Sequence, residues 1–398
     1  MHVNNQNTVI LAFVPNYDWN EPWQPRHYIL SRLAEKYKVL WISQPVYWAD
    51  FFRAKKKPAK RKRLQKISES LFCYAPNLPA DYVPPYQNSR MPPVARKIYH
   101  QVWLFIQTLS IKYQLKKLKA KKIILYLWQP YYYEQIGRFN EDVVCYHIDD
   151  EYHYDSNTDN PVSEKERKII EKSDIVFIHS KTLLEKKGHI NKNTVYMPNG
   201  VDFEMYRRII KNTSHLPEDI ARIPKPVIGY AGWIKRHLDL KLLLNIARLR
   251  GDWSFVLVGP IRWEHTDIHQ DIELLKKEKN VFFLGCKAVE ELPVYINAMD
   301  VCLMPYRITS YTKYIYPLKL HEYLACGKPV VSTKLEQINE YEKALYFTDT
   351  TQNWIEQINR SLHESNELLK MKRMKIAQKN SWEKRVKIIS YHFDKILS

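Results

Sequence analysis

The stretch YPLKLHEYLACGKPVVST, residues 316–333, joins a helical pattern to an apolar strand and is the most informative part of the sequence. Gly327 can end the helix, since glycine tolerates the left-handed backbone common at helix ends. Lys319 and Glu322 lie three residues apart, so they share one face of that helix. Free N–H groups at a helix start near Pro317 favour an anion, and the Glu322 carboxylate can accept hydrogen bonds from a diol. The plainer alternative is a surface ion pair between Lys319 and Glu322.

Strand-like segments alternate with helical segments on both sides of this stretch. In the first half they are VILAFV (9–14), KVLWIS (38–43), KKIILYL (121–127), VVCYHI (143–148), DIVFIHS (174–180) and NTVYMP (193–198). The rhythm restarts after a polar stretch with PVIGYAG (226–232), WSFVLVG (253–259), NVFFLG (280–285), DVCLMPY (300–306) and KPVVST (328–333). Such alternation predicts two Rossmann-like α/β halves with parallel sheets. We expect the chain to divide into residues 1–203, 204–380 and a final helix at 381–398.

The composition excludes several classes of protein. The 398 residues carry a net charge of +19, but residues 51–122 hold 18 lysines and arginines against Glu69 and Asp81, and the rest is nearly neutral. No apolar run is long enough to span a membrane, and the N-terminus lacks the features of a secretory signal. The five scattered cysteines give no zinc or disulfide pattern, so we expect a cytoplasmic chain without a metal. The absence of G-x-G-x-x-G argues against a nicotinamide or flavin dehydrogenase, and we expect no cofactor.

The basic block interrupts the α/β pattern between residues 50 and 120. A candidate amphipathic helix, ARKIYHQVWLFIQTLSIKYQLKKLKAKK, follows the densest charge. The block fits an anionic membrane surface, a nucleic acid or a solvated loop; no nucleic-acid motif accompanies it, so we favour the membrane. The expected membrane contacts are Arg53, Lys55, Lys56, Lys57, Lys60, Arg61, Lys62, Arg63, Trp103 and Phe105.

The string at 316–333 resembles the donor-binding helix of GT-B glycosyltransferases of the family 4-like group, which read P-x-K-L-[FH]-E-Y-L-A-x-G-K-P-V-V. VIGYAGWI (227–234) and VYMPNGVD (195–202) resemble further segments of that family, with teichuronic-acid and exopolysaccharide enzymes as the nearest type. The resemblance implies a GT-B fold, with two Rossmann-like domains facing a cleft and a C-terminal helix returning to the first domain. It also implies transfer of a sugar from a nucleotide donor, with UDP favoured, to a lipid-linked or growing saccharide in bacterial cell-surface polysaccharide synthesis. The enzyme would lie at the inner face of the cell membrane.

The resemblance also assigns donor-binding residues. Glu322 matches the second Glu of the E-x7-E motif, which binds the ribose, and Lys319 matches the cation aimed at the phosphates. The remaining donor-binding matches are Gly232, Lys235 and Arg236 in the loop after the strand 226–232, and Lys287, which is expected beside the base of the nucleotide. Tyr314 stands where the family has its first Glu, which contacts the transferred sugar in retaining members. This departure leaves the stereochemistry and the donor sugar open. Two rival functions remain: a GT-B sugar-nucleotide epimerase, which would need no lipid acceptor, and a non-catalytic binding scaffold, which the absence of the first Glu would allow.

A base for the acceptor hydroxyl is expected in the first half, in VVCYHIDDEYHYD. The strand 143–148 would deliver His147, Asp149 and Asp150 to the carboxyl edge of the sheet, where ligands of open α/β sheets bind. We favour Asp149 as the base, then Asp150, then His147. The alternatives are a helix cap or loop for either aspartate and a structural role for His147. Asp18, in the aromatic loop after the first strand, is a weaker candidate.

Overall fold

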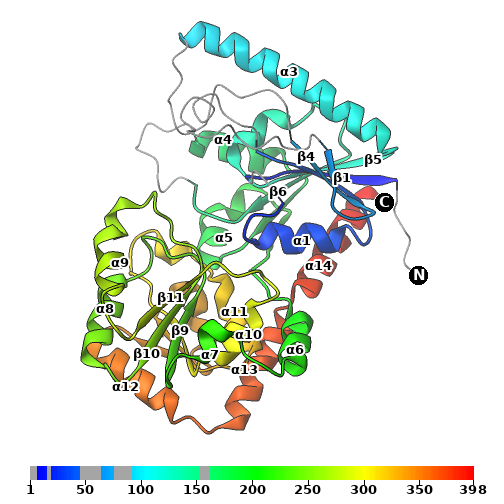
Figure 1. Ribbon diagram of the computed structural model, residues 1–398. Helices are drawn as coiled ribbons and strands as arrows, with labels where there is room; N and C mark the ends of the chain where they lie inside the picture. The colour runs from blue at the N-terminus through cyan, green and yellow to red at the C-terminus, as the bar shows by residue number, and fades with distance from the viewer. Residues whose placement is uncertain (1–6, 16–18, 45–63, 76–91, 153–161) are drawn as a thin grey trace. The chain divides into compact units, whose positions relative to one another are not determined.

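The computed structural model describes residues 7–15, 19–44, 64–75, 92–152 and 162–398. The chain divides into two compact units: Met1–Pro198 together with Val386–Ser398, and Asn199–Arg385. The helix α14 (Trp382–Leu397) begins in the second unit, and its residues from Val386 onward belong to the first. Figure 1 gives the positions of the elements within each unit.

The first unit is built on an eight-stranded sheet with the order β3-β4-β2-β1-β5-β6-β7-β8. Its neighbouring strands run parallel, except that β3 pairs antiparallel with β4 at one edge. The strands are β1 (Thr8–Phe13), β2 (Lys38–Ile42), β3 (Leu64–Lys66), β4 (Leu71–Tyr74), β5 (Lys122–Leu127), β6 (Val143–Ile148), β7 (Ile175–Ile178) and β8 (Thr194–Tyr196). Strands such as β1 and β6 are buried along their whole length, as expected for a sheet covered on both faces.

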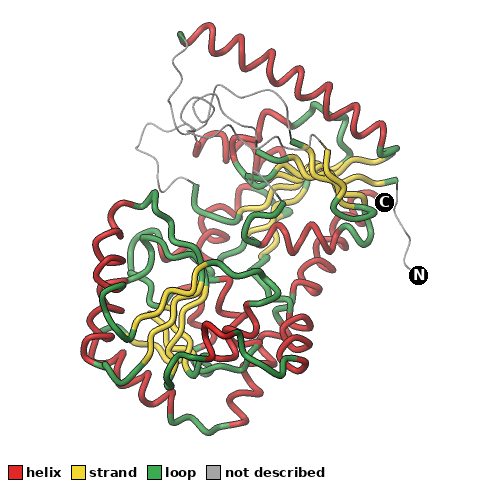
Figure 2. The backbone as a smooth tube through the Cα atoms, viewed as in Figure 1, coloured by secondary structure: helices red, strands yellow, loops and turns green. Residues whose placement is uncertain are grey.

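Helices cover both faces of this sheet (Figures 1 and 2). The helices and the short 3-10 helix η1 are α1 (Pro25–Leu33), α3 (Pro93–Lys117), η1 (Pro130–Gln135), α4 (Val162–Lys172) and α5 (Lys181–Lys187). On one face, α1 and α14 meet an aromatic layer, in which the Phe393 ring packs against Tyr37 and Tyr126. On the other face, Ser110 of α3 contacts Tyr74 of β4, and Glu166 of α4 contacts Tyr146 of β6.

The block at residues 50–120 is only partly an insertion. Residues 71–74 form β4, which pairs with β2 inside the parallel sheet, and residues 64–66 form the edge strand β3. The sequence analysis missed both strands because each has at most four residues and lies between charged or proline-rich stretches. The block therefore contributes to the core of the first unit.

The second unit contains a six-stranded parallel sheet with the order β11-β10-β9-β12-β13-β14. Its strands are β9 (Val227–Ala231), β10 (Ser254–Val258), β11 (Val281–Gly285), β12 (Val301–Met304), β13 (Val330–Thr333) and β14 (Tyr346–Thr348). Its helices are α6 (Phe203–Asn212), α7 (Glu218–Ala221), α8 (Leu240–Leu249), α9 (His269–Leu275), α10 (Leu292–Ala298), α11 (Leu318–Ala325), α12 (Thr351–Leu362) and α13 (Glu367–Lys379). α8 packs with α9 and α12, whereas α11 packs with α6 and α13 (Figure 1).

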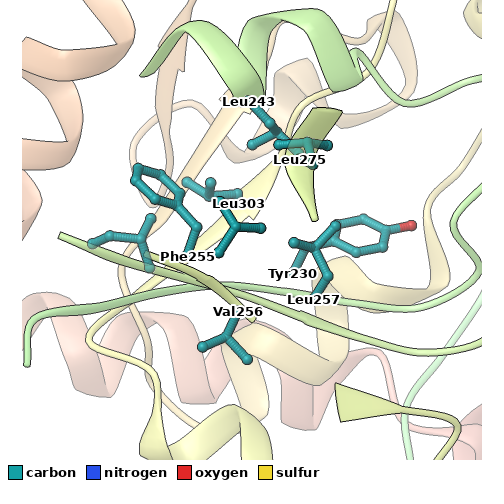
Figure 3. A pocket seen from close by; sticks show the side chains of 9 residues that line it. Tyr230, Leu243, Phe255, Val256, Leu257, Leu275 and Leu303 are labelled. Atoms are coloured by element: carbon teal, nitrogen blue, oxygen red, sulfur yellow. The ribbon is translucent and has the colours of Figure 1, made fainter. Parts of the chain in front are cut away.

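A small cavity lies between this sheet and the helices α8 and α9 (Figure 3). Its lining is apolar and includes Leu243, Phe255, Leu275 and Leu303, while the Tyr230 hydroxyl points away from it. Its volume of about 10 Å³ is about the least that can hold one water molecule. The cavity is therefore a packing gap in the core and no place for a substrate.

Among the described residues, no helix combines the length and the apolar composition that crossing a bilayer requires.

Candidate functional site

α11 carries Lys319 and Glu322 at the carboxyl edge of the second sheet. The helix ends at Ala325, and Gly327 follows with a positive φ of 70°, as the sequence predicts for a glycine that stops a helix. The Lys319 side chain lies beside Gly232, the first residue after β9. A methyl group on Gly232 would come within 2.9 Å of the Lys319 Cε atom, and Gly232 has a φ of 137°. The glycine therefore lets the lysine approach the strand end closely.

Lys319 is a partly buried cation held by aromatic groups. Its Nζ donates a 2.7 Å hydrogen bond to the Tyr306 hydroxyl, and it lies 5.0 Å from the centre of the Tyr230 ring. Burial lowers the pKa of Lys319, but Tyr230 and Tyr306 outweigh that effect and raise the pKa above its usual range. No carboxylate among the described residues forms a salt bridge with this cation. Its charge is therefore available for an anionic ligand.

Glu322 is a buried carboxyl group, with 7% of the residue exposed. No hydrogen bond from the described residues reaches its carboxylate, which is uncommon for a buried polar group. Burial raises the pKa of Glu322 to about 7, and the Lys319 charge opposes that shift only in part. A buried carboxyl group without a hydrogen-bond partner is suited to a ligand that brings its own hydroxyl groups.

The raised pKa of Glu322 leads to a pH-dependent prediction for stability. The folded protein holds the Glu322 proton up to about pH 7, whereas an unfolded chain releases it near 4.5, so this group stabilises the fold less as the pH rises through that interval. Above pH 7 the charged, buried group costs about 3 kcal/mol. Glu322→Gln removes that cost, so the free energy of unfolding of the variant should increasingly exceed that of wild type between pH 5 and about pH 8.

Denaturant unfolding at several pH values checks this expectation. Glu342→Gln is the matched control, because Glu342 is an exposed glutamate of the same unit. A difference between Glu322→Gln and wild type that stays constant with pH would contradict the assigned pKa.

The loop after β9 adds positive charge at the same sheet edge. Arg236 is exposed and lies 3.8 Å from Asp267, and Lys235 is half-buried. Burial lowers the pKa of His237 to about 3, with Lys235 as the next cause. Arg262 stacks on the Trp233 ring at 3.8 Å from its centre. The local potential is therefore positive, which favours a phosphate group.

Two other residues expected to bind the donor, Lys287 and Tyr314, already interact with neighbouring residues or are buried. Lys287 donates a 2.6 Å hydrogen bond to Asp219, whose carboxylate also accepts from the Tyr295 hydroxyl. Tyr314 is buried in a short 3-10 helix, η4 (Thr312–Tyr314), that precedes α11. The Lys287 charge is thus already neutralised, and Tyr314 offers a ring where a carboxylate was expected.

In the first unit, Asp149 follows β6 at the carboxyl edge, as predicted. Its carboxylate accepts a 3.0 Å hydrogen bond from Arg26 Nη1 and another from the Tyr152 hydroxyl. The same Tyr152 hydroxyl lies 2.8 Å from the Trp128 carbonyl oxygen, so its one proton has two acceptors within reach. Asp150 accepts a 2.8 Å hydrogen bond from the Glu151 N–H. The structure thus joins Asp149 to α1 and to the end of β5.

Arg26 is a functional candidate that the sequence analysis missed. It is 7% exposed, it donates to Asp149 and to the Gln24 side chain, and its Nε has no hydrogen-bond partner among the described residues. Arg26 lies 123 residues before Asp149 in the chain, so no local sequence pattern indicates that the two side chains interact. The signal available was an arginine directly after a proline at a helix start, which is too common to single out.

His147 lies inside the aromatic layer below this edge. Its ring stacks on Trp128 and Tyr126, and its Nδ1 is 2.8 Å from the Tyr126 hydroxyl. Burial lowers the pKa of His147 to about 3, with His179 as the next cause. The imidazole is therefore neutral and enclosed, which favours the structural role over that of a base.

A buried ion cluster supports the segment that carries the two aspartates. Lys187 Nζ lies 2.9 Å from Glu151 Oε1 and 2.8 Å from Glu166 Oε1, and Lys186 reaches the other Glu151 oxygen. The three side chains Glu151, Lys187 and Glu166 are almost fully buried. This cluster ties the chain after β6 to α4 and α5, and so fixes the end of the strand.

The predicted membrane residues have mixed outcomes. Arg53, Lys55, Lys56, Lys57, Lys60, Arg61, Lys62 and Arg63 lie outside the described residues, as does Asp18. Trp103 was assigned wrongly: it is 8% exposed and stacks on His100 on the inner side of α3. Phe105 is 60% exposed on the opposite side. Periodicity alone did not separate these two faces because both are apolar.

No group of three or more His, Cys, Asp or Glu side chains suited to a metal ion occurs within the described ranges.

Known proteins resemble this chain both in sequence and in fold. Residues 225–364 match the family described as glycosyl transferases group 1. Over this part, the chain is therefore similar to the glycosyl transferases of group 1. Over 194 residues the chain is 30% identical to TuaH of Bacillus subtilis (strain 168), a protein assigned to teichuronic acid biosynthesis as a glycosyltransferase. That match covers 46% of each protein, so the chain spans about half the length of this relative.

Solved structures show the same fold over nearly the whole chain. Sucrose-phosphate synthase from Thermosynechococcus elongatus has a TM-score of 0.71 at 14% identity, covering 98% of this chain and 99% of that one. The Anabaena protein Alr3699/HepE in complex with UDP has a TM-score of 0.66 at 14% identity, covering 98% and 100%. The chain therefore has the GT-B fold, as the sequence resemblance implied.

Proposed function

We propose that this protein is a glycosyltransferase that takes a sugar from a nucleotide donor, with UDP as the nucleotide. One observation carries the proposal: Lys319 and Glu322 share a face of α11, the first without a carboxylate partner and the second without a hydrogen bond among the described residues. A nucleoside diphosphate supplies what both lack, namely negative charge for the lysine and ribose hydroxyls for the carboxylate. The UDP bound in the Anabaena structure of the same fold supports this choice.

In this mechanism the second unit holds the leaving group. Lys319, Lys235 and Arg236 neutralise the diphosphate as charge develops on it, and they take the role that a metal ion has in other transferases. Gly232 leaves room for Lys319, and Glu322 orients the ribose. Lys287 and Tyr314 contribute through backbone and ring contacts in this scheme, since the Lys287 charge is engaged by Asp219.

The first unit supplies the acceptor side. Asp149 accepts the proton of the acceptor hydroxyl, with Asp150 as the second candidate. The acceptor is a lipid-linked or growing saccharide of a bacterial cell-surface polysaccharide, which the relation to TuaH supports. The enzyme works as a cytoplasmic, peripheral protein at the inner face of the cell membrane.

Incubation with radiolabelled UDP-sugars and a bacterial membrane extract tests the proposal. Label should enter the lipid or polysaccharide fraction, and a chelator should not prevent it. Interconversion of the free UDP-sugar would instead support an epimerase. Binding of UDP-sugar without any turnover would support a scaffold, and either result would overturn the transferase.

A further inference from the structure

α3 has two apolar faces, and the described residues cover only one of them. Its inner face carries Trp103, Leu104, Ile111 and Leu115, which are buried against the first unit. The outer face carries seven large exposed residues, here called the outer ridge: Val94, Ile98, Val102, Phe105, Ile106, Leu109 and Tyr113. Apart from the adjacent pair Phe105 and Ile106, they recur at intervals of three and four residues, so they form one continuous stripe about 30 Å long. Soluble monomeric proteins rarely expose such a long apolar stripe, and larger exposed apolar patches mark sites of interaction with proteins or membranes.

The charges around the outer ridge identify the partner. The lysines of α3 with described side chains are Lys97, Lys112, Lys116 and Lys117, and the helix contains no aspartate or glutamate. A helix with an open apolar stripe, flanking lysines and no acidic residue matches the surface of an anionic bilayer, where acyl chains meet negatively charged headgroups. Lysine side chains at its border can extend toward the headgroups while their carbon chains stay in contact with lipid.

The direction of α3 relates the outer ridge to the proposed acceptor site. Lys38, the first residue of β2, donates a hydrogen bond to the carbonyl of Leu118, which directly follows α3. The C-terminal end of α3 therefore lies at the amino edge of the sheet. His100 contacts Glu134 in η1, which follows β5, so the N-terminal half of α3 lies at the carboxyl edge. Asp149 follows β6 at that same carboxyl edge.

We infer that the outer ridge of α3 inserts into the interfacial region of an anionic membrane and brings the carboxyl edge of the first sheet to acceptors that are themselves anchored in lipid. The membrane contact stands on the outer ridge and its charges. The identity of the acceptor rests on the proposed function. The outer ridge replaces Trp103 as the apolar part of the membrane contact.

Flotation with vesicles of phosphatidylglycerol and phosphatidylethanolamine tests the inference on the full chain. The triple variant Ile98→Gln, Phe105→Gln and Leu109→Gln should lose at least roughly tenfold in vesicle affinity. The control triple variant Leu249→Gln, Leu368→Gln and Met371→Gln removes equally exposed apolar side chains from the second unit and should bind as wild type does. Binding should also weaken in high salt and on phosphatidylcholine vesicles, because headgroup charge contributes to it.

The outcomes separate the possible partners of the outer ridge. Equal vesicle binding by both triple variants would overturn the inference. A change from dimer to monomer in the first triple variant, without a change in vesicle binding, would assign the outer ridge to a second copy of the chain and would also overturn it. If the triple variant melts at a lower temperature, Phe105→Gln alone gives the same test. UDP binding is measured separately and reports on the proposed function. Failure of the membrane inference can therefore be distinguished from failure of the proposed function.

Discussion

Lys319→Met is expected to weaken UDP binding by about 10- to 100-fold, the effect of removing a hydrogen bond to a charged group from a partly buried site. In the wild type, Lys319 is held by the Tyr306 hydroxyl and the Tyr230 ring, so its position is set before the ligand binds. Methionine keeps most of the length and volume of the side chain and removes the ammonium group with its charge and donors. The loss should therefore be electrostatic, and it should shrink at high salt.

Calorimetric titration with UDP measures this effect. Lys313→Met is the matched control: Lys313 is an exposed lysine of the neighbouring 3-10 helix, beside the Tyr314 ring, and its substitution should change UDP affinity little. Gly232→Ala offers a second route to the same site, because its methyl group would displace the Lys319 side chain. Unchanged UDP affinity in Lys319→Met would contradict the assignment of this cation to the diphosphate.

The sequence predicted local features of the fold better than the partners of individual side chains. The helix at Leu318–Ala325 and its stop at Gly327 depend on local preferences, which one sequence carries in full. The partners of Lys287 and Asp149 depend instead on residues distant in the chain, Asp219 and Arg26, and no local pattern specifies such pairs.

The sequence also did not predict which face of α3 is turned toward the core. The helical spacing of its apolar residues predicted the helix, but a helix that is apolar on two sides gives no indication of which side faces the core. Only the packing against Tyr74 and η1 settles that Trp103 points inward and Phe105 outward. The sequence therefore suffices to predict an amphipathic helix, whereas the structure is needed to identify which of its apolar residues are exposed.

Asp149→Asn should lower kcat for sugar transfer by about a hundred- to ten-thousandfold, the usual effect of losing a general base. UDP affinity should not change, since the residues proposed to hold the nucleotide belong to the second unit. Asp150→Asn, the neighbouring control, should have a smaller effect on kcat. The reverse order of the two effects would transfer the role of base to Asp150.

Asp149→Asn also leaves the Arg26 guanidinium without its carboxylate, so part of any loss could come from instability. The double variant Arg26→Gln with Asp149→Asn removes both charges and should regain most of the melting temperature lost by Asp149→Asn alone, because the buried cation is gone as well. It should not regain kcat, because asparagine cannot accept the hydroxyl proton. If kcat returned together with the melting temperature, Asp149 would act only as the counter-ion of Arg26, and the base would have to be sought elsewhere.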